Sequence, residues 1–198
     1  MNKSYNKMTK SQNSYTKYRW FFTSSGKLII GGKSAEQNEL LVKEVLKSGV
    51  DYITMHTHNP GSPFTFLVDE GLNELDLEEQ AIFTACFSQE WKKRKKSAVI
   101  DIFDSKQIAK SKGMKRGTFG VLGKINRRTV ELKLGLEIQE GVLRAVPRPK
   151  EALLWIKPGL LEKDKASKEI QGILKDKKVN FLMEEIDRAL PAGGIEII

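Results

Sequence analysis

Thirteen lysine or arginine side chains but only two carboxylates fall within residues 91–130, so this segment has a net charge of +11. The formal charge of the whole 198-residue chain is +9. This segment, which we call the basic block, therefore carries all of the excess positive charge. Phosphate backbones are the commonest partners of such concentrated charge. The pattern predicts a surface that binds a polyanion.

The order of charges along the chain sharpens this prediction. Residues 1–35 hold seven basic side chains and no acid, whereas residues 36–90 have a net charge of −9. A fold that brings residues 1–35 against the basic block would have one basic face. The run KKRKK has a simpler interpretation too, because cations are favoured at the C-terminal end of a helix. The eight cations between Ser105 and Val130, with no acid among them, favour phosphate binding.

The two histidines of the chain, His56 and His58, are the one candidate for metal chemistry. They lie two residues apart in an expected strand, so both side chains can point to one face and supply half of a metal site. A third ligand would have to come from Cys86, Asp51 or another acid. A metal-dependent hydrolase is therefore an open alternative, although structural hydrogen bonds, stacking on a base or contact with a phosphate are the favoured roles. We expect no metal and no cofactor.

Covalent catalysis has little support in the sequence. Cys86, the single cysteine, falls mid-helix on an apolar face, where a thiol is usually a small core residue. The chain contains no GxSxG, HExxH or GxxxxGK[ST] segment. We therefore expect a protein that is not an enzyme and has no catalytic residue.

Size and composition indicate one soluble domain, or one such domain with a small appendage. Hydrophobic residues make up 39% of the chain, charged residues make up 30%, and the mean hydropathy is −0.40. No apolar run approaches the ~18–20 residues of a membrane span, and the basic N-terminus lacks the apolar segment of a secretory signal. A single cysteine suits a reducing compartment. We therefore expect a cytoplasmic location and no membrane partner.

Hydrophobic periodicity and turn residues predict an α+β fold, a single domain with a mainly antiparallel β-sheet flanked by helices. Ser34 with Gln37, and Asp76 with Glu79, fit capping boxes that begin helices, and Gly49 is expected to end the first of them. The strands 19–23 and 27–30 are expected to pair as a hairpin, and the strand 142–146 can pair with 130–136. Residues 1–16, rich in Asn, Ser and Lys, are expected to form a disordered basic tail. The expected strands are 19–23, 27–30, 52–57, 64–68, 98–103, 118–122, 130–136, 142–146 and 153–156, and the expected helices are 35–47, 77–91, 165–174 and 181–190.

Several segments, in their order and spacing, resemble the NFACT-R domain, the RNA-binding module of the NFACT proteins of ribosome-associated quality control. An aromatic strand, a second strand that ends in Gly-Gly and a helix with Gln-Asn-Glu are matched by RWFFTSSGKLIIGGKSAEQNELLVKEVL. The next strand with its glycine loop, a helix that ends near a Trp and a Lys-Gly-Ser-Phe segment are matched by DYITMHTHNPGSPF, DLEEQAIFTACFSQEWK and KRGTFGVLGKIN. The resemblance covers residues 18–191 and is to a free-standing, archaeal-type version of the module.

This resemblance implies an RNA-binding domain at 17–198, with the last two helices, about 164–191, as a C-terminal extension. It implies a non-catalytic protein that binds tRNA or ribosomal RNA in the quality control of stalled translation, and it leaves the large ribosomal subunit open as a partner. A general DNA-binding or polyanion-binding protein is the alternative, and the oligomeric state stays open. The residues expected to bind RNA are Arg19, His56, Lys92, Lys93, Arg94, Lys95, Lys96, Lys110, Lys112, Lys115, Arg116, Lys124, Arg127 and Arg128.

Overall fold

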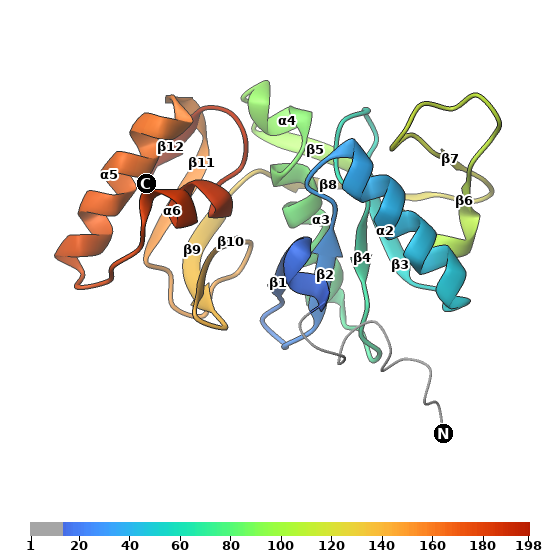
Figure 1. The fold of residues 1–198 in the computed structure, drawn as a ribbon, viewed down its shortest axis with the longest axis horizontal. Helices are drawn as coiled ribbons and strands as arrows, with labels where there is room; N and C mark the ends of the chain where they lie inside the picture. The colour runs from blue at the N-terminus through green and yellow to red at the C-terminus, as the bar shows by residue number, and fades with distance from the viewer. Residues whose placement is uncertain (1–13) are drawn as a thin grey trace.

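Six antiparallel strands form the larger sheet, in the order β1-β2-β4-β3-β5-β8 (Figure 1). The protein is described by a computed structural model over residues 14–198. Strand β4 lies between β2 and β3, so the order in the sheet departs from the order in the chain. The strands are β1 (Arg19–Phe22), β2 (Leu28–Gly31), β3 (Ile53–Thr57), β4 (Thr65–Leu67), β5 (Ser97–Asp104) and β8 (Asn126–Glu131).

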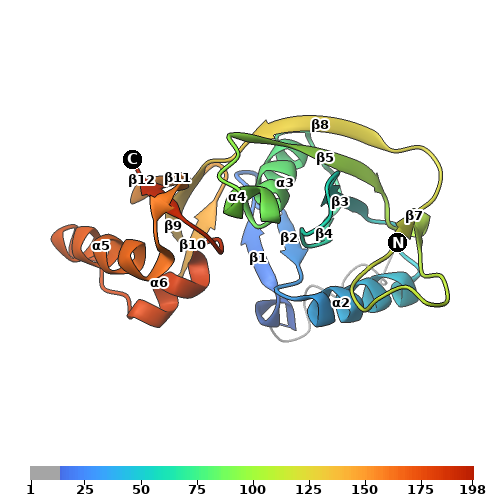
Figure 2. The same ribbon diagram turned by 90° about the horizontal axis from the view of Figure 1, so that it is seen from above.

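Helices cover both faces of this sheet, with α2 (Ala35–Ser48) on one face and α3 (Glu74–Cys86) on the other (Figure 2). Successive side chains of a strand point to opposite faces. In β2, Ile30 therefore belongs to the hydrophobic cluster of α2, whereas Ile29 belongs to the cluster that contains Phe83 of α3. Every residue of β2 is buried as a result.

A second sheet of four antiparallel strands, in the order β10-β9-β11-β12, follows in the chain (Figure 1). Two helices, α5 and α6, pack against it. The remaining elements are β9 (Leu134–Gln139), β10 (Val142–Val146), β11 (Leu154–Leu161), β12 (Ile195–Ile197), α5 (Lys163–Asp176), α6 (Met183–Ala189), the short helix α4 (Gln89–Lys92), the ribbon of β6 (Ile108–Ala109) with β7 (Gly120–Val121), and the 3-10 turns η1 (Ser14–Lys17) and η2 (Ser105–Gln107).

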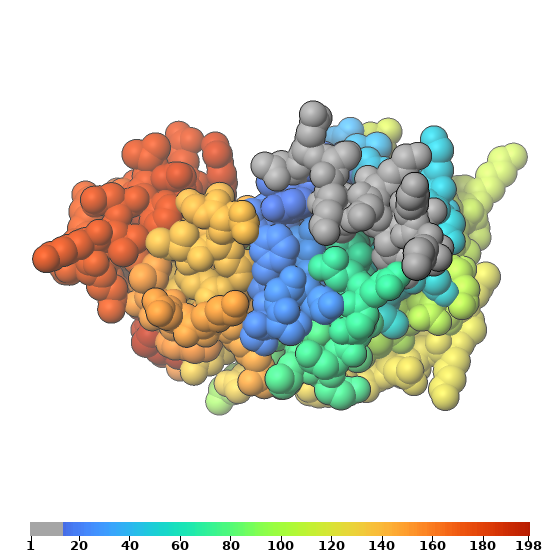
Figure 3. All heavy atoms as spheres, turned by 90° about the horizontal axis from the view of Figure 1, so that it is seen from below, coloured from blue at the N-terminus to red at the C-terminus, as the bar shows by residue number. Residues whose placement is uncertain are grey.

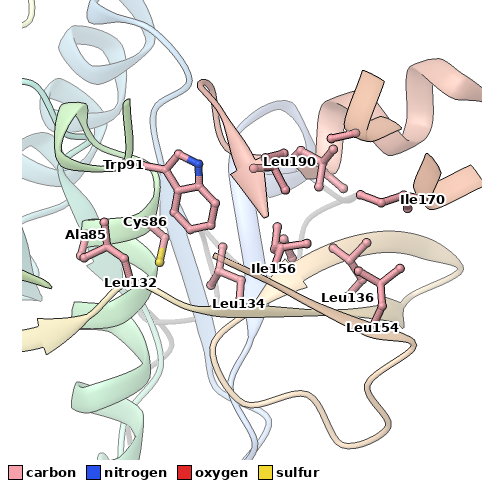
Figure 4. Close-up of a cluster of buried hydrophobic side chains, with 14 of the residues drawn as sticks. Ala85, Cys86, Trp91, Leu132, Leu134, Leu136, Leu154, Ile156, Ile170 and Leu190 are labelled. Carbon is pink, nitrogen blue, oxygen red and sulfur yellow. The ribbon is translucent and has the colours of Figure 1, made fainter. Parts of the chain in front are cut away.

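One hydrophobic core joins the two sheets, so the chain forms a single α+β domain with antiparallel sheets, as predicted. Figure 4 shows Trp91 of α4, Leu132 and Leu134 in the same cluster as Ile170 of α5. The Trp91 indole Nε1 donates a hydrogen bond to the carbonyl oxygen of Gly194 at 3.0 Å. This bond fixes the segment before β12 to α4.

Where the two sheets meet, the Gln139 side chain at the end of β9 hydrogen-bonds to the backbone of β1, in place of pairing between two strands. Gln139 accepts a hydrogen bond from the Phe22 amide through Oε1 at 2.8 Å and donates one to the Phe22 carbonyl through Nε2 at 2.7 Å. Figure 3 shows the β1 segment, in blue, beside the β9–β10 hairpin, in orange. The hairpin thus lies beside the β1 edge of the larger sheet.

Helix α2 begins where the sequence predicts and ends within a residue of the expected position. Ser34 Oγ accepts a hydrogen bond from the Gln37 amide at 3.2 Å, which is the expected N-cap. Gly49 ends the helix with φ of 70°, a left-handed conformation that favours glycine. The antiparallel pairing of β1 with β2, and of β9 with β10, is also confirmed.

The expected helix over 77–91 is wrong in its start and in its length. Asn73, and not Asp76, caps α3, because Asn73 Oδ1 accepts from the Asp76 amide at 2.9 Å and Asp76 Oδ2 accepts from the Asn73 amide at 3.1 Å. Near the other end, Ser88 Oγ accepts from the Glu90 amide at 3.0 Å and begins a separate helix, α4. The helical spacing of apolar residues continues through this break, so the sequence predicts a helix that is too long.

The expected strand over 130–136 is two strands. Strand β8 ends at Glu131 and β9 begins at Leu134, and the chain passes from the larger sheet to the smaller one between them. Val130 and Leu132 are buried in the same core as the β9 leucines, which explains why the alternation continues across the break. The expected strand over 118–122 shortens to the two residues of β7.

The disordered tail expected at the N-terminus falls largely on residues 1–13, which lie outside the described residues. Residues 14–16 belong to η1. The Tyr15 ring packs edge-on against Trp20 with 5.1 Å between ring centres, a favourable aromatic geometry. Within residues 14–198, no helix combines the length and the hydropathy that crossing a membrane requires.

Candidate nucleic-acid interface

A cleft of about 690 Å³ lies where the C-terminal ends of β2 and β3 meet the N-terminus of α2. The β3–β4 loop, the α3–α4 junction and the β6–β7 loop form its rim. All three lie toward the top of Figure 1. Ligand pockets usually measure about 300–1,000 Å³, so the cleft has room for one ligand of that class.

Cations from two distant parts of the sequence meet at the cleft. Arg19 and Lys33 come from the N-terminal basic segment, and Lys92 and Arg116 come from the basic block. Among the described residues that line the cleft, Asp101 is the one carboxylate. The fold thus gathers the two basic segments at one surface, which the charge pattern suggested but did not fix.

Arg19 is a partly buried cation on an aromatic platform. Its guanidinium carbon lies 3.9 Å from the centre of the Phe87 ring. Burial, assisted by the positive charge of Arg144, lowers the pKa of Arg19 to about 10, so the side chain stays charged at neutral pH. Within residues 14–198, no carboxylate forms an ion pair with it. An anion that enters the cleft would supply the missing counter-charge.

Two further cations near Arg19 are absent from the predicted site. Burial lowers the pKa of Lys33, and the charges of Arg19 and Arg144 lower it further. Burial also lowers the pKa of Arg144 to about 10, and its guanidinium carbon lies 3.9 Å from the centre of the Trp20 ring. Lys33 belongs to the N-terminal basic segment, so the charge pattern of the sequence could have indicated it. Arg144 comes from the C-terminal part, whose net charge is zero, so the charge pattern gave no reason to expect it at the cleft.

The two histidines line the cleft in different environments. His56 is partly buried, with its ring centre 4.6 Å from that of Phe64 and its Nδ1 2.7 Å from the Thr57 carbonyl oxygen. Burial lowers the pKa of His56, so the imidazole is neutral at pH 7. His58 is exposed, with Nδ1 3.2 Å from Asp101 Oδ2. Within residues 14–198, no three His, Cys, Asp or Glu side chains are grouped to hold a metal ion.

Lys110 holds the β6–β7 loop against α2. Its Nζ lies 2.8 Å from Glu39 Oε2 and donates to the carbonyls of Lys115 and Thr118 at 2.8 and 3.0 Å. The Gly117 amide donates to the same Glu39 oxygen at 2.9 Å. Hydrogen bonds from Lys110 and Gly117 lower the pKa of Glu39 to about 2. The structure therefore places Lys110, a predicted RNA contact, where it positions the loop.

The β6–β7 loop presents Phe119 to the cleft. The Phe119 ring is partly exposed and stands almost perpendicular to that of Phe64, with 5.5 Å between their centres. The loop approaches α2 closely at Gly117, which has φ of 74°. A Cβ atom there would lie 2.7 Å from the carbonyl oxygen of Ala35. Both the backbone conformation and the contact with α2 therefore require glycine.

The KKRKK run forms the turn between α4 and β5. The amides of Lys93 and Arg94 donate to the carbonyls of Gln89 and Trp91, and Arg94 has φ of 55°. All five side chains of the run are exposed. Lys93 pairs with Glu90 at 3.0 Å. Only Lys92 of the run lines the cleft. The run consists of Lys92, Lys93, Arg94, Lys95 and Lys96.

The two arginines of β8 lie on opposite faces of the larger sheet, because successive side chains of a strand point to opposite faces. Arg127 Nε lies 2.9 Å from Oδ1 of the cleft residue Asp101. Arg128 reaches Glu74 at the start of α3, with a guanidinium nitrogen 2.8 Å from Oε2. The structure thus does not bring these two predicted contacts together, and of the two only Arg127 contacts a residue that lines the cleft.

The remaining predicted cations lie on the surface between β6 and β8. Lys112, Lys115 and Lys124 are exposed and form no ion pair within the described residues. Arg116 is exposed too, with a guanidinium nitrogen 4.0 Å from Glu36. These ammonium and guanidinium groups are available to an external phosphate.

Cys86 is a core residue, as predicted. Its side chain is fully buried in the core shared by the two sheets. Burial raises the pKa of the thiol well above its ordinary value. The protonated thiol at neutral pH is a weak nucleophile.

Residues 17–123 match the family model described as the NFACT protein RNA binding domain. This match covers more than half of the chain, so the chain belongs to that family, as its resemblance to the NFACT-R domain indicated. The matched segment contains all residues that line the cleft except Ile125 and Ala192.

Individual relatives agree with this assignment. The chain is 33% identical over 210 residues to the archaeal Rqc2 homolog aRqcH of Methanocaldococcus jannaschii, across 97% of this chain and 30% of that protein. It is 28% identical over 116 residues to the ribosome quality control complex subunit NEMF of Mus musculus and of Homo sapiens, across 57% of this chain and 11% of each relative. The chain therefore spans 30% or less of the length of these relatives.

A solved structure shares the fold. It is the C-terminal part of the fibronectin/fibrinogen-binding protein from Streptococcus suis, with a TM-score of 0.50 at 21% identity. The similarity covers 64% of this chain and 47% of that one.

Proposed function

We propose that this protein binds RNA through the cleft and the cations on its rim, and that it acts in the quality control of stalled translation without catalysing a reaction. The observation that carries the proposal is the meeting of cations from two distant segments at one cleft, within the part of the chain that matches the family. The names of its relatives, which are ribosome quality control proteins, support the cellular role. The RNA is tRNA or ribosomal RNA, the large ribosomal subunit is a partner, and the location is the cytoplasm.

Phosphate contacts come from exposed cations. Lys92 lines the cleft on one side, and Arg116 lines it on the β6–β7 loop, where Lys112 and Lys115 are also exposed. Lys92, Lys112 and Lys115 form no ion pair within the described residues, and Arg116 has only the 4.0 Å contact with Glu36. Lys110 contributes by positioning the loop. Contacts of this kind release counterions, so each neutralised phosphate adds roughly −0.7 to −0.9 to the slope of log affinity against log salt.

A competition experiment tests the RNA assignment. A labelled tRNA is bound to the protein at physiological salt, and unlabelled tRNA, a ribosomal RNA fragment and duplex DNA of equal phosphate number are added in turn. We expect tRNA or the ribosomal RNA fragment to compete better than the duplex DNA. Equal or better competition by DNA would identify a general polyanion-binding protein instead.

A further inference from the structure

The cleft combines positive charge with exposed ring surface, which a site for phosphate alone does not need. We propose that the cleft holds one unstacked nucleotide from a single-stranded segment of the bound RNA. This inference rests on the RNA-binding function proposed above and names the form of RNA that the cleft accepts.

Aromatic surface for the base lies on two sides of the cleft. Phe119 and His56 both pack against Phe64, and both are partly exposed. His56 is neutral because burial lowers its pKa, so its ring offers a stacking face without a charge. On another wall, the guanidinium plane of Arg19 rests on Phe87. Unpaired RNA bases stack on aromatic rings and on arginine planes of this kind.

Positive charge for the phosphate lies beside these rings. Burial lowers the pKa of both Lys33 and Arg19, and the neighbouring charge of Arg19 lowers the pKa of Lys33 further. The start of α2 lines the same wall at Ser34 and Ala35, and the first amides of a helix have no acceptor within the helix. One phosphate would therefore gain two counter-charges and amide donors together.

A duplex does not satisfy this site. Bases in an A-form helix are stacked on each other, and the deep, narrow major groove hides their edges from side chains. The rings of the cleft lie inside a cavity of about 690 Å³, at the ends of β2 and β3 and behind the β6–β7 loop. A splayed-out nucleotide can enter such a cavity, whereas a paired base cannot.

The experiment uses the full chain and a 12-nucleotide RNA, single-stranded or paired with its complement. The fluorescent base 2-aminopurine, and separately an abasic site, is placed at each position of the single strand in turn. The variants are Phe119→Leu, which keeps apolar bulk but removes the ring, and Arg19→Lys, which keeps the charge but removes the guanidinium plane. Lys168→Gln, on the exposed face of α5, is the control. Thermal unfolding confirms that each variant is folded.

We expect the single strand to bind more tightly than the duplex, and an abasic site at one position to weaken binding about 5- to 100-fold. The 2-aminopurine fluorescence should change at that position, and both cleft variants should remove the change while Lys168→Gln keeps it. Equal binding of single strand and duplex, with no effect of any abasic site, would overturn the nucleotide pocket but leave RNA binding intact. Failure to bind either RNA would overturn the proposed function itself.

Discussion

The ammonium group of Lys110 lies 2.8 Å from a carboxylate oxygen of Glu39, a residue 71 positions earlier in the chain. Through this pair the β6–β7 loop is attached to α2, and Phe119 is held at the mouth of the cleft. Lys110, which was predicted to contact RNA, therefore holds the loop in place. Its partner Glu39 belongs to the acidic segment 36–90, so an acidic residue positions part of a basic surface.

Replacement of Glu39 should release the loop. In Glu39→Gln the Lys110 ammonium and the Gly117 amide lose the charged acceptor that they share. We expect faster hydrogen exchange at residues 110–119 and weaker RNA binding, with an unchanged fold elsewhere. Glu44→Gln, which removes an acceptor on the other side of α2, is the control and should leave the loop unaffected. Unchanged exchange in Glu39→Gln would mean that the carboxylate does not hold the loop.

The same pair predicts a pH dependence with a defined sign. Hydrogen bonds lower the pKa of Glu39 from the ordinary 4.5 to about 2 in the folded protein. The ionised carboxylate therefore stabilises the fold fully above about pH 4.5, and this contribution is lost as the pH falls through about 2. The difference in unfolding free energy between the wild type and Glu39→Gln should be constant above pH 4.5 and shrink below it. A carboxyl titration by NMR with its midpoint near 4.5 would contradict this.

Two glycines of the β6–β7 loop offer a matched comparison. Gly117 and Gly113 both have positive φ, 74° and 91°, but only at Gly117 would a Cβ collide, with Ala35 at 2.7 Å. Gly113→Ala should cost about 1 kcal/mol, from backbone conformation alone. Gly117→Ala should cost more, roughly 2–3 kcal/mol, and lower the melting temperature by about 4–12 °C. Equal losses in calorimetry would show that the approach to α2 is not tight.

The two arginines of β8 should differ in their effect on RNA. Arg127→Gln removes a cation and leaves Asp101 less neutralised beside the cleft. We expect RNA affinity to fall on the order of fivefold, equivalent to about 1 kcal/mol. Arg128→Gln, on the opposite face, should leave the affinity within twofold. A larger effect of Arg128→Gln in the same titration would place the RNA on the α3 side of the sheet.

Charge reversal on the β6–β7 loop tests whether the cations of the cleft rim produce the salt dependence of RNA binding. Lys115→Glu with Arg116→Glu changes two exposed cations of the cleft rim, and Lys168→Glu with Lys175→Glu makes the same change on α5. The rim variant should bind RNA far more weakly and with a shallower salt slope, by about 0.7–0.9 for each lost phosphate contact. The α5 variant should keep the wild-type slope. If the two variants behave alike, the response reflects net charge and not the rim.

Local signals in the sequence predicted much of the fold. The Ser34 cap, the Gly49 stop and the antiparallel hairpins depend on neighbouring residues, and these are confirmed. Tertiary packing decided the cases that failed. Asp76 and Glu79 resembled the start of a solvated helix, but both are buried, and their carboxylates accept hydrogen bonds from hydroxyls of the β1–β2 turn. Hydrogen bonds between residues more than 50 positions apart in the chain leave no pattern in the local sequence.

The cleft was predictable in its charge but not in its geometry. The basic block predicted that Lys92 and Arg116 would contact RNA, and the order of charges along the chain left open that Arg19 would lie at the same surface. Two features depended on the three-dimensional arrangement. The alternation of β8 sends Arg128 away from the cleft, and the neutral C-terminal part returns Arg144 to the neighbourhood of Arg19.

Mapping of RNA-crosslinked residues by mass spectrometry shows whether RNA occupies the cleft, because it reports which side chains touch RNA. The full chain is crosslinked by ultraviolet light to a bound tRNA and digested. We predict crosslinks in residues 56–64, 87–92 and 116–119, which contain most of the residues that line the cleft, and weaker crosslinks there in Arg19→Lys with Phe119→Leu. Crosslinks confined to α5, α6 or β11, unchanged in that variant, would contradict it.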